Sequence, residues 1–371
     1  MTTQTLADEA FGTDLYQLLA EDAPDLVFSP ASVAAALRMA LCGARDETAA
    51  ELAAALRLRT GDASDLAAAG LRELDSLVAS TPEGITFRVA NTAWVQSGMP
   101  LLPDFTSRLQ ATRTSTITSA DFATAPEQAR KRINSAIEEL TAGKITDLIA
   151  AGAIGTLTRL VLANAVYLKA PWARPFPEQA THSAPFHPGD GHDVTVPMMR
   201  GTANRRYVRR DGYQAVLLPY RNSTLAMAIA LPDGPLSDLG TRRLSDLLSG
   251  TALRQVTLSL PRFRVESSVN LAPALENLGV TTAFTARADF SGITDAGPLH
   301  ITAAVHKAYI DVDEQGTEAA AATAAIFAAS ALTKPPPRVE MVVDRPFLYA
   351  IIDAASGSLL FLGQVTNPGR T

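Results

Sequence analysis

The 371-residue chain has the composition of a folded protein with a sizeable core, because 47% of its residues are hydrophobic and 19% are charged. Its net charge of −6 argues against nucleic-acid binding, which needs a basic surface. The single cysteine, Cys42, excludes an internal disulfide and lies in an apolar helical run, where we expect a buried, unreactive thiol. No apolar stretch is long enough to cross a membrane, and the N-terminal residues lack the basic start and apolar core of a signal peptide. The sequence therefore predicts a cytoplasmic protein.

Helical patterns dominate the first part of the chain. Apolar side chains fall on one face of a helix over residues 6–20. Ser29 can cap a helix that begins at Pro30, a favoured first position, and ends at Gly43. Further helices are expected at 46–57, 63–79, 103–111 and 125–140.

From about residue 156 the pattern becomes that of strands. Residues 160–168 are apolar at nearly every position, which predicts a strand buried on both faces. The turn at 353–358 would join the last two strands into a hairpin. Short helices fit 237–248 and 270–278, and strands fit 193–198, 204–208, 214–219, 224–231, 255–265, 300–312, 339–343, 347–353 and 358–365. Helices followed by strands, with no internal repeat or linker, predict one α+β domain over residues 1–371.

The sequence lacks the motifs of the common enzyme classes: the nucleophile elbow, the zinc-protease helix, the P-loop and the dinucleotide-binding glycine motif. His182, His187 and His192 recur every five residues, a spacing that does not bring side chains onto one face of a helix or strand. Ser32 and His306 are a candidate nucleophile pair, for which a buried structural hydrogen bond is the better interpretation. We therefore expect no catalytic residue, no metal and no cofactor.

The longest basic cluster is Arg205-Arg206 with Arg209-Arg210. We interpret it as a solvated strand edge rather than a binding site. The helical region 63–79 contains a single arginine as its only basic residue, which is too little charge for a polyanion such as heparin.

Residues 314–325 stand out by composition, because six of the twelve are alanine and none is proline or aromatic. Alanine is the best helix former, but this run directly follows the strand candidate ending at 312. Beyond it come three prolines, at 335–337, and then further strand candidates. A run of small residues between two stretches of sheet suggests a segment that can enter the sheet as a strand.

Strand alternation supports that interpretation. If Thr317 faces inward, its side of the strand carries only small or apolar residues: Thr317, Ala319, Ala321, Thr323, Ala325 and Phe327. The opposite side carries the only charge, Glu318, and Gly316 provides a flexible pivot. No proline lies between Gly316 and Ser330, so every backbone N–H there can bond to a neighbouring strand.

Short motifs follow one another along almost the whole chain. They are Phe28-Ser-Pro-Ala-Ser32, Asn134 with Thr141-Ala-Gly-Lys-Ile145, Leu162-Ala-Asn-Ala-Val-Tyr-Leu-Lys169, Trp172 with Pro175-Phe176, Val196-Pro-Met-Met199, Leu231-Pro-Asp233, Leu260-Pro-Arg-Phe263, Leu278-Gly-Val280, Val305-His-Lys307, the run 314–325, Arg345-Pro-Phe347 and Gly363-Gln-Val-Thr-Asn-Pro368. Each motif alone is weak, but the series in this order resembles the serpins, the family of suicide inhibitors of serine and cysteine proteases.

The resemblance implies the serpin fold, an α+β arrangement of about nine helices around three β-sheets, whose large central sheet accepts a reactive loop as an extra strand. It implies that residues 314–338 form this loop. Its hinge would comprise Glu314, Gly316, Thr317, Glu318, Ala319, Ala320, Ala321 and Ala322. A polar cluster that controls the parting of the central strands would comprise Ser29, Ser32, Asn164 and His306. Trp172 would lie at the top of the sheet, where Glu314 would pair with Arg262.

The resemblance also implies a suicide-substrate inhibitor of serine proteases, in which the target cleaves the loop and the acyl-enzyme is trapped by loop insertion. The family's usual loop length, counted from Glu314, places the reactive bond between Ser330 and Ala331. Because the segment is a few residues longer than usual, three other cut sites stay open: Phe327, Leu332 and Lys334. The small residues before Ala331 suit an elastase-like protease, Phe327 or Leu332 a chymotrypsin-like one, and Lys334 a trypsin-like one.

The alternative is a non-inhibitory serpin-fold carrier or chaperone. Such members carry bulky or charged residues on the inserting face of the hinge, and this hinge carries none there. The resemblance favours a prokaryotic inhibitory serpin, acting as a monomer, whose partner is a serine protease held in a covalent acyl-enzyme complex. The charge pattern and the lack of a long apolar stretch predict no heparin, nucleic-acid or membrane partner. The resemblance leaves an extracellular location open.

Overall fold

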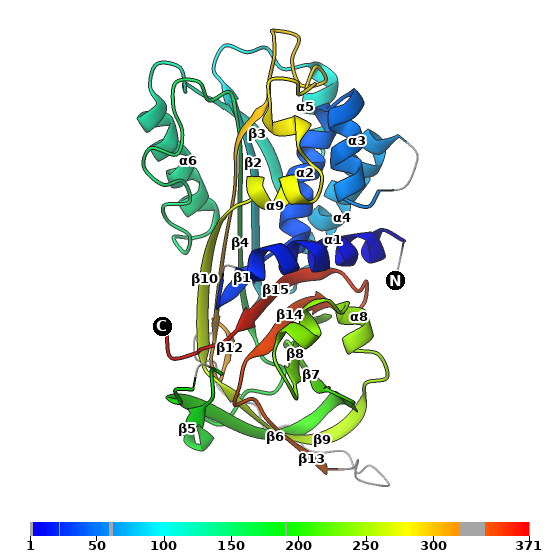
Figure 1. The fold of residues 1–371 in the computed structure, drawn as a ribbon, viewed down its shortest axis with the longest axis vertical. Coiled ribbons are helices and arrows are strands. Elements are labelled where there is room, and N and C mark those ends of the chain that lie inside the picture. The colour runs from blue at the N-terminus through cyan, green and yellow to red at the C-terminus, as the bar shows by residue number, and fades with distance from the viewer. Residues whose placement is uncertain (1–2, 22, 59–61, 190, 319–337, 371) are drawn as a thin grey trace.

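Figure 1 shows the computed structural model, which describes residues 3–370 except 22, 59–61, 190 and 319–337. Nine α-helices lie within the described residues: α1 (Thr3–Ala20), α2 (Pro30–Gly43), α3 (Asp46–Ala55), α4 (Ala63–Ala79), α5 (Pro103–Gln110), α6 (Pro126–Leu140), α7 (Ser237–Gly240), α8 (Leu244–Leu247) and α9 (Ala272–Asn277). Each expected helical segment is present, although 237–248 is two short helices, α7 and α8. No helix in the described part of the chain is both long and apolar enough to span a membrane.

Helix α2 starts as its sequence predicts. The Ser29 side chain accepts a hydrogen bond from the Ser32 N–H at 3.1 Å, and Pro30 occupies the first turn, where its missing N–H costs nothing. Almost every residue of α2 is buried, because α1, α4 and the sheets surround it (Figure 1). Cys42 near its end is buried, as predicted, and burial raises the pKa of its thiol to about 11, which disfavours the reactive thiolate.

A six-stranded sheet runs along the long axis of the molecule, in the order β10-β11-β12-β4-β2-β3 (Figure 1). Its strands are β2 (Thr86–Gln96), β3 (Ser115–Ala120), β4 (Leu160–Pro171), β10 (Phe263–Asn270), β11 (Ile301–Val312) and β12 (Gly316–Thr317). Residues of β4 are buried on both faces, as the apolar run predicts. Along β4, Leu160 and Leu162 face the core that contains α2, whereas Ala163 and Ala165 pack against the core formed with α6.

The second sheet has nine strands in the order β1-β15-β14-β8-β7-β6-β9-β13, with β5 also paired to β6. They are β1 (Leu26–Phe28), β5 (His182–Phe186), β6 (Val194–Arg210), β7 (Tyr213–Pro219), β8 (Leu225–Pro232), β9 (Ala252–Pro261), β13 (Arg338–Val342), β14 (Phe347–Asp353) and β15 (Leu359–Val365). Strand β6 pairs with β9 along 198–207 and with β7 along 207–210. Because β6 pairs with both groups of strands, the described strands form two sheets where three were expected.

Four strand predictions need correction. Residues 193–198 and 204–208 belong to one strand, β6, because β9 continues to pair across the polar residues between them. Residues 255–265 belong to two strands, β9 and β10, which separate at Arg262. The basic cluster of β6 does lie on locally unpaired edges, since Arg205 and Arg206 pair only with β9 and Arg209 and Arg210 only with β7, but Arg205 is 5% exposed and so is not solvated as expected. Strands β1, β2, β3 and β5 carry no clear period and are missing from the prediction.

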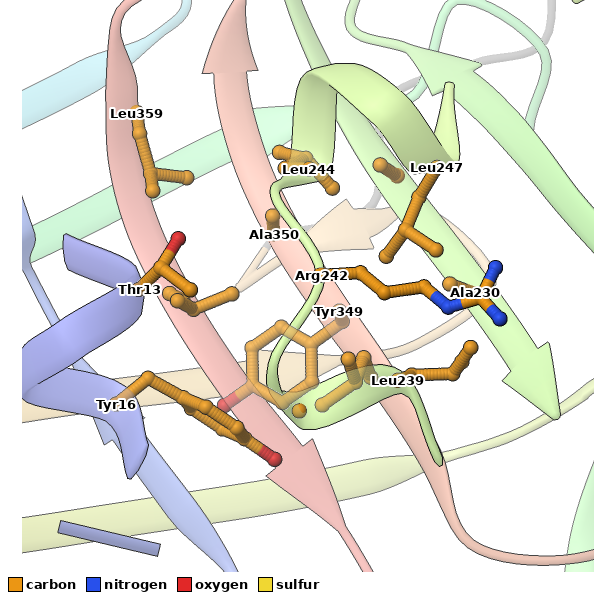
Figure 2. Close-up of a pocket in the computed structure, with 14 residues that line it drawn as sticks. Thr13, Tyr16, Ala230, Leu239, Arg242, Leu244, Leu247, Tyr349, Ala350 and Leu359 are labelled. Atoms are coloured by element: carbon orange, nitrogen blue, oxygen red, sulfur yellow. The ribbon is translucent and has the colours of Figure 1, made fainter. Parts of the chain in front are cut away.

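A small cavity lies where α1 and the α7–α8 segment cover β8, β14 and β15. Figure 2 shows Tyr16 approaching it from α1, with Leu239 and Leu247 of the α7–α8 segment on the opposite side. Its volume of about 20 Å³ is room for a single water molecule, so we assign it no ligand.

Candidate functional site

The hinge begins in a tight turn after β11. The carboxylate of Asp313 accepts hydrogen bonds from the N–H groups of Gln315, at 2.7 Å, and Gly316, at 3.1 Å. The Asp313 N–H in turn donates to the Gly316 carbonyl at 3.0 Å. Side-chain bonds of this kind favour turns, so the chain reverses direction and runs back along β11.

The next two residues, Gly316 and Thr317, form the short strand β12 between the ends of β11 and β4. Thr317 pairs with Val312 on one side and with Ala170 on the other, and Gly316 pairs with Pro171. A Cβ at Gly316 would lie 2.7 Å from the Pro171 Cα and closer still to the Ala170 carbonyl oxygen. Since both neighbours are backbone atoms, only glycine allows this approach.

Aromatic side chains hold the start of β12. The Thr317 side chain is fully buried, and its hydroxyl lies 2.6 Å from that of Tyr220. The Tyr220 ring stacks on Trp172, with ring centres 4.7 Å apart and an interplanar angle of 11°. The Trp172 indole N–H donates to the backbone carbonyl of Asp313 at 2.9 Å. The Trp172 backbone N–H donates to the backbone carbonyl of Gln315, also at 2.9 Å. The structure therefore places Trp172 against the hinge, at the end of β4.

Glu314 is anchored to Arg262 by several bonds. The Arg262 Nε lies 2.9 Å from both carboxylate oxygens, and its Nη2 lies 2.7 Å from one of them. The Thr181 hydroxyl also donates to this carboxylate, and the Phe176 N–H donates to the Glu314 carbonyl at 2.9 Å. Burial by itself would raise the pKa of Glu314, but the bonds from Arg262 and Thr181 lower it below its usual value. The acidic residue at the start of the hinge is thus ionised and fixed.

At Glu318 the chain leaves the sheet. Its φ of +46° is in the left-handed region, and its N–H donates to the Asp311 carbonyl at 2.8 Å. The Glu318 carboxylate forms an ion pair with Lys144, which follows α6. The same carboxylate lies near Tyr167, and its charge adds to burial in raising the pKa of the Tyr167 hydroxyl. Tyr167 and Tyr309 face each other where β4 and β11 resume direct pairing. The strands are therefore parted by the two residues of β12, and they pair directly again three residues further along each strand, at Tyr167 and Tyr309.

The four polar residues expected beneath the central sheet lie together between α2, β4 and β11. Asn164 and His306 are directly opposite in the parallel β4–β11 pair and are hydrogen-bonded. His306 Nε2 accepts the Ser29 N–H at 3.1 Å, so the ring proton is on Nδ1, which donates to the side-chain oxygen Oδ1 of Asn164. The Asn164 amide donates to the hydroxyl and carbonyl of Ser32, at 2.7 and 2.9 Å. Ser32 and His306 are thus joined through Asn164 in a buried hydrogen-bond network, the arrangement that the sequence favours over a nucleophile pair.

Asn91 on β2 belongs to this cluster and is missing from the prediction. Its side-chain oxygen accepts the Ser32 hydroxyl at 3.1 Å and also the Asn164 amide, which lies directly opposite it in the β2–β4 pair. The available signal was a lone amide between Ala90 and Thr92 in a run that is otherwise mostly apolar. All members are buried, and burial lowers the pKa of His306 to about 3, so this ring is neutral near neutral pH.

The remaining loop residues lie outside the described part of the chain. They are Ala319, Ala320, Ala321 and Ala322 of the hinge and the cut-site candidates Phe327, Ser330, Ala331, Leu332 and Lys334. The histidines at 182 and 187 bond locally, to the Ala180 carbonyl at 3.2 Å and to Asp193 at 2.7 Å. Among the described residues, no three His, Cys, Asp or Glu side chains are close enough to share a metal ion.

A family model described as Serpin (serine protease inhibitor) matches residues 6–368. The chain therefore belongs to the serpin family. It is 35% identical over 384 aligned residues to the leukocyte elastase inhibitor of Bos taurus, covering 99% of this chain and 100% of that protein. An uncharacterised serpin-like protein of Thermococcus kodakarensis is 37% identical over 370 residues, covering 98% of this chain and 85% of that protein. The solved structure of Serpin48, a highly specific serpin of the insect Tenebrio molitor, has a TM-score of 0.87 and 30% identity, covering 98% of each chain.

Proposed function

We propose that this chain, as one serpin domain over residues 1–371, inhibits serine proteases by the suicide-substrate route. The observation that carries the proposal is the seam between β11 and β4. Two hinge residues, Gly316 and Thr317, already occupy it at one end, and direct pairing resumes at Tyr167 and Tyr309. A loop that continues from Thr317 is already paired with β11 and β4 and could extend between them as a further strand. Similarity to the leukocyte elastase inhibitor supports a protease as the partner.

The first chemical step is attack on the loop by the protease. In this proposal the serine hydroxyl of the protease adds to the carbonyl carbon of Ser330 and expels the amino group of Ala331. An ester bond forms as the peptide bond breaks, and the hydroxyl proton ends on the new amine. Cleavage separates the two halves of the loop, so the segment that begins at Thr317 is free to move.

Insertion of that segment would supply the trapping energy. Each inserted residue replaces one β4–β11 ladder by two ladders, a net gain of about one backbone hydrogen bond worth roughly 1 kcal/mol. Over about a dozen residues, the gain is comparable to the ~5–15 kcal/mol that stabilise a protease domain. A protease tethered to the inserting strand can therefore be deformed before water hydrolyses the ester. The uninserted form is then metastable and held by a kinetic barrier.

The polar cluster of Ser29, Ser32, Asn164 and His306 is proposed to set part of that barrier. The Asn164–His306 bond crosses the seam that the loop must enter, so insertion requires this buried bond to break. The bonds from Ser29 and Ser32 tie both strands to the start of α2. Breaking buried bonds without replacement costs about 1–3 kcal/mol each, which is enough to slow opening.

The test is incubation with elastase, chymotrypsin and trypsin, followed by denaturing electrophoresis and mass spectrometry. A complex that survives denaturation, with release of the C-terminal peptide, is the expected result. The mass of this peptide distinguishes cleavage at Ser330–Ala331 from cleavage after Phe327, Leu332 or Lys334. A protease without its catalytic serine is the control and should give no complex. Complete cleavage without any complex would contradict inhibition and favour the carrier or chaperone function.

A further inference from the structure

An exposed face of the nine-stranded sheet is the strongest feature that the proposed mechanism leaves unexplained. Opposite residues of paired strands share a face, so the register defines its members on β6, β9 and β13. We call its accessible part the arginine face: Arg200, Thr202, Asn204, Arg206, Leu253, Gln255, Thr257, Arg338, Glu340 and Val342. Each of these residues is exposed or half-buried.

The arginine face is positively charged in a protein of net charge −6. It carries three arginines and one glutamate, of which Arg200 and Glu340 pair at 2.8 Å. Within the described part of the chain, Arg206 and Arg338 form no ion pair with a carboxylate. From strand spacing and register their backbones lie about 12 Å apart, close enough for one partner surface to contact both. The face therefore presents two available guanidinium groups.

Leu253 lies between these arginines on β9, directly opposite Arg206. It is 51% exposed, one of the few large apolar side chains in the described residues with that much exposure. Arginine and apolar side chains placed together, with neutral polar residues such as Asn204 and Gln255 around them, are typical of protein–protein interfaces. Nucleic acid and polyanions would select for more lysine and arginine and would not need the leucine.

Protection of a sheet edge explains only part of this pattern. Strand β13 is an edge strand, and Arg338 alone could discourage pairing with another molecule. At Arg206 strand β6 pairs with β9 and with no other described strand, so Arg206 could also discourage edge pairing. Edge protection does not account for the exposed Leu253 beside it. On the other side of β6, Arg205 is 5% exposed and bonds to the carbonyls of Gly201 and Val256, at 3.2 and 3.0 Å, without a carboxylate partner. Its buried charge strengthens the positive potential of this end of the sheet.

The arginine face lies close in the chain to the proposed reactive bond, which makes the target protease the expected partner. Arg338 lies eight residues after Ser330, a separation of at most about 28 Å even when fully extended. A serine protease domain of about 240 residues has a radius of gyration near ~18 Å and so is about 45 Å across. A protease bound at the reactive bond is therefore large enough to contact the arginine face while it holds the loop.

We propose that the arginine face is a second docking surface for the target protease, and that it favours proteases with carboxylates beside the active-site cleft. This inference rests on the proposed inhibitory function. Arg206 and Arg338 bind those carboxylates, and Leu253 makes the apolar contact between them. Because the face lies outside the β4–β11 seam, it affects the rate of association and not the trapping step.

The experiment measures the second-order rate constant of inhibition with two proteases that cleave the same loop bond, one with an acidic surface and one with a basic surface. The main variant is Arg206→Glu with Arg338→Glu, and Arg206→Glu alone avoids any effect on the nearby loop. The matched control is Arg72→Glu with Arg287→Glu, an equal charge change at exposed arginines of α4 and of the segment after η2 (Thr282–Phe284).

At low salt we expect the main variant to inhibit the acidic protease about tenfold more slowly, and the difference to shrink as salt screens the charges. The basic protease should be inhibited at an unchanged or higher rate, the control should change less than twofold, and the amount of covalent complex should be unchanged throughout. An equal loss with both proteases, or equal rates for main and control variants, would overturn the docking surface. So would arginine-dependent binding to a sulfated polysaccharide without any effect on inhibition. If the unaltered chain forms no complex with any protease, the proposed function itself fails and this inference with it.

Discussion

Glu318 and Lys144 form an ion pair at the point where the hinge leaves the sheet. Lys144 follows α6, and a local network fixes its backbone: the Thr141 hydroxyl accepts the Ile145 N–H at 3.2 Å, and the Lys144 N–H donates to the Thr141 carbonyl, also at 3.2 Å. Glu318 adopts a left-handed backbone that a strand residue cannot keep. The pair is therefore specific to the conformation with two hinge residues inserted, and further insertion must break it.

Replacing Lys144 with Met should accelerate insertion. The ion pair stabilises only the starting conformation, and since the Lys144 side chain is 43% exposed we expect its loss to destabilise that state by about 0.5–1 kcal/mol. The rate of protease trapping after loop cleavage should then rise by about two- to fivefold, measured by rapid-mixing fluorescence of a labelled loop. Lys131→Met, at an exposed lysine of α6, is the control. An unchanged trapping rate in Lys144→Met would show that this pair does not restrain the hinge.

Ala321→Pro should convert the inhibitor into an ordinary substrate. Proline lacks the N–H that a central strand donates, and its ring obstructs the neighbouring strand. Cleavage at the reactive bond should continue at a similar rate while the covalent complex disappears, as measured by gel and by turnover of loop peptide. Ala321→Ser, which keeps the N–H and the small size, should still form the complex. Trapping by the proline variant would contradict loop insertion.

Loop cleavage should raise thermal stability. If the cut segment adds a strand between β4 and β11, the cleaved chain gains a ladder on both sides of it, and its unfolding temperature should rise by tens of degrees. Differential scanning calorimetry before and after limited proteolysis measures this change. The cleaved Ala321→Pro variant provides the comparison and should gain much less. Coincident melting curves for the intact and cleaved chains would count against a metastable native state.

His306 should make stability depend on pH. Burial lowers the pKa of its imidazole to about 3, so the folded chain does not take up the proton that the unfolded chain binds below about pH 6.5. This contribution is fully present above pH 6.5 and is lost as the pH falls, by about 2 kcal/mol at pH 5. Urea unfolding at pH 7, 6 and 5 should show a smaller loss for His306→Gln than for the unaltered chain. His182→Gln, at an exposed histidine, should keep the full slope.

Local signals predicted the elements that depend on few neighbours. The cap at Ser29, the proline at the start of α2 and the buried run of β4 follow from side-chain preferences that act within a few residues. Strand β2 was missed because its stability comes from ten cross-strand pairs with β4, a segment far along the chain. Asn91 was missed for the same reason, since its role appears only when β2 places it opposite Asn164.

The sequence by itself determined that residues 314–325 suit a strand, because small side chains and the absence of proline are local properties. It also determined the order of motifs that identifies the family. Only the tertiary structure decided how much of that strand is in the sheet: Gly316 and Thr317 are inserted, and Glu318 turns out toward Lys144. Likewise, only the pairing of β6, β9 and β13 brought Arg206, Leu253 and Arg338 onto one face. Apart from the Val312–Thr317 pair, these contacts join segments separated by tens to hundreds of residues, and no local preference specifies them.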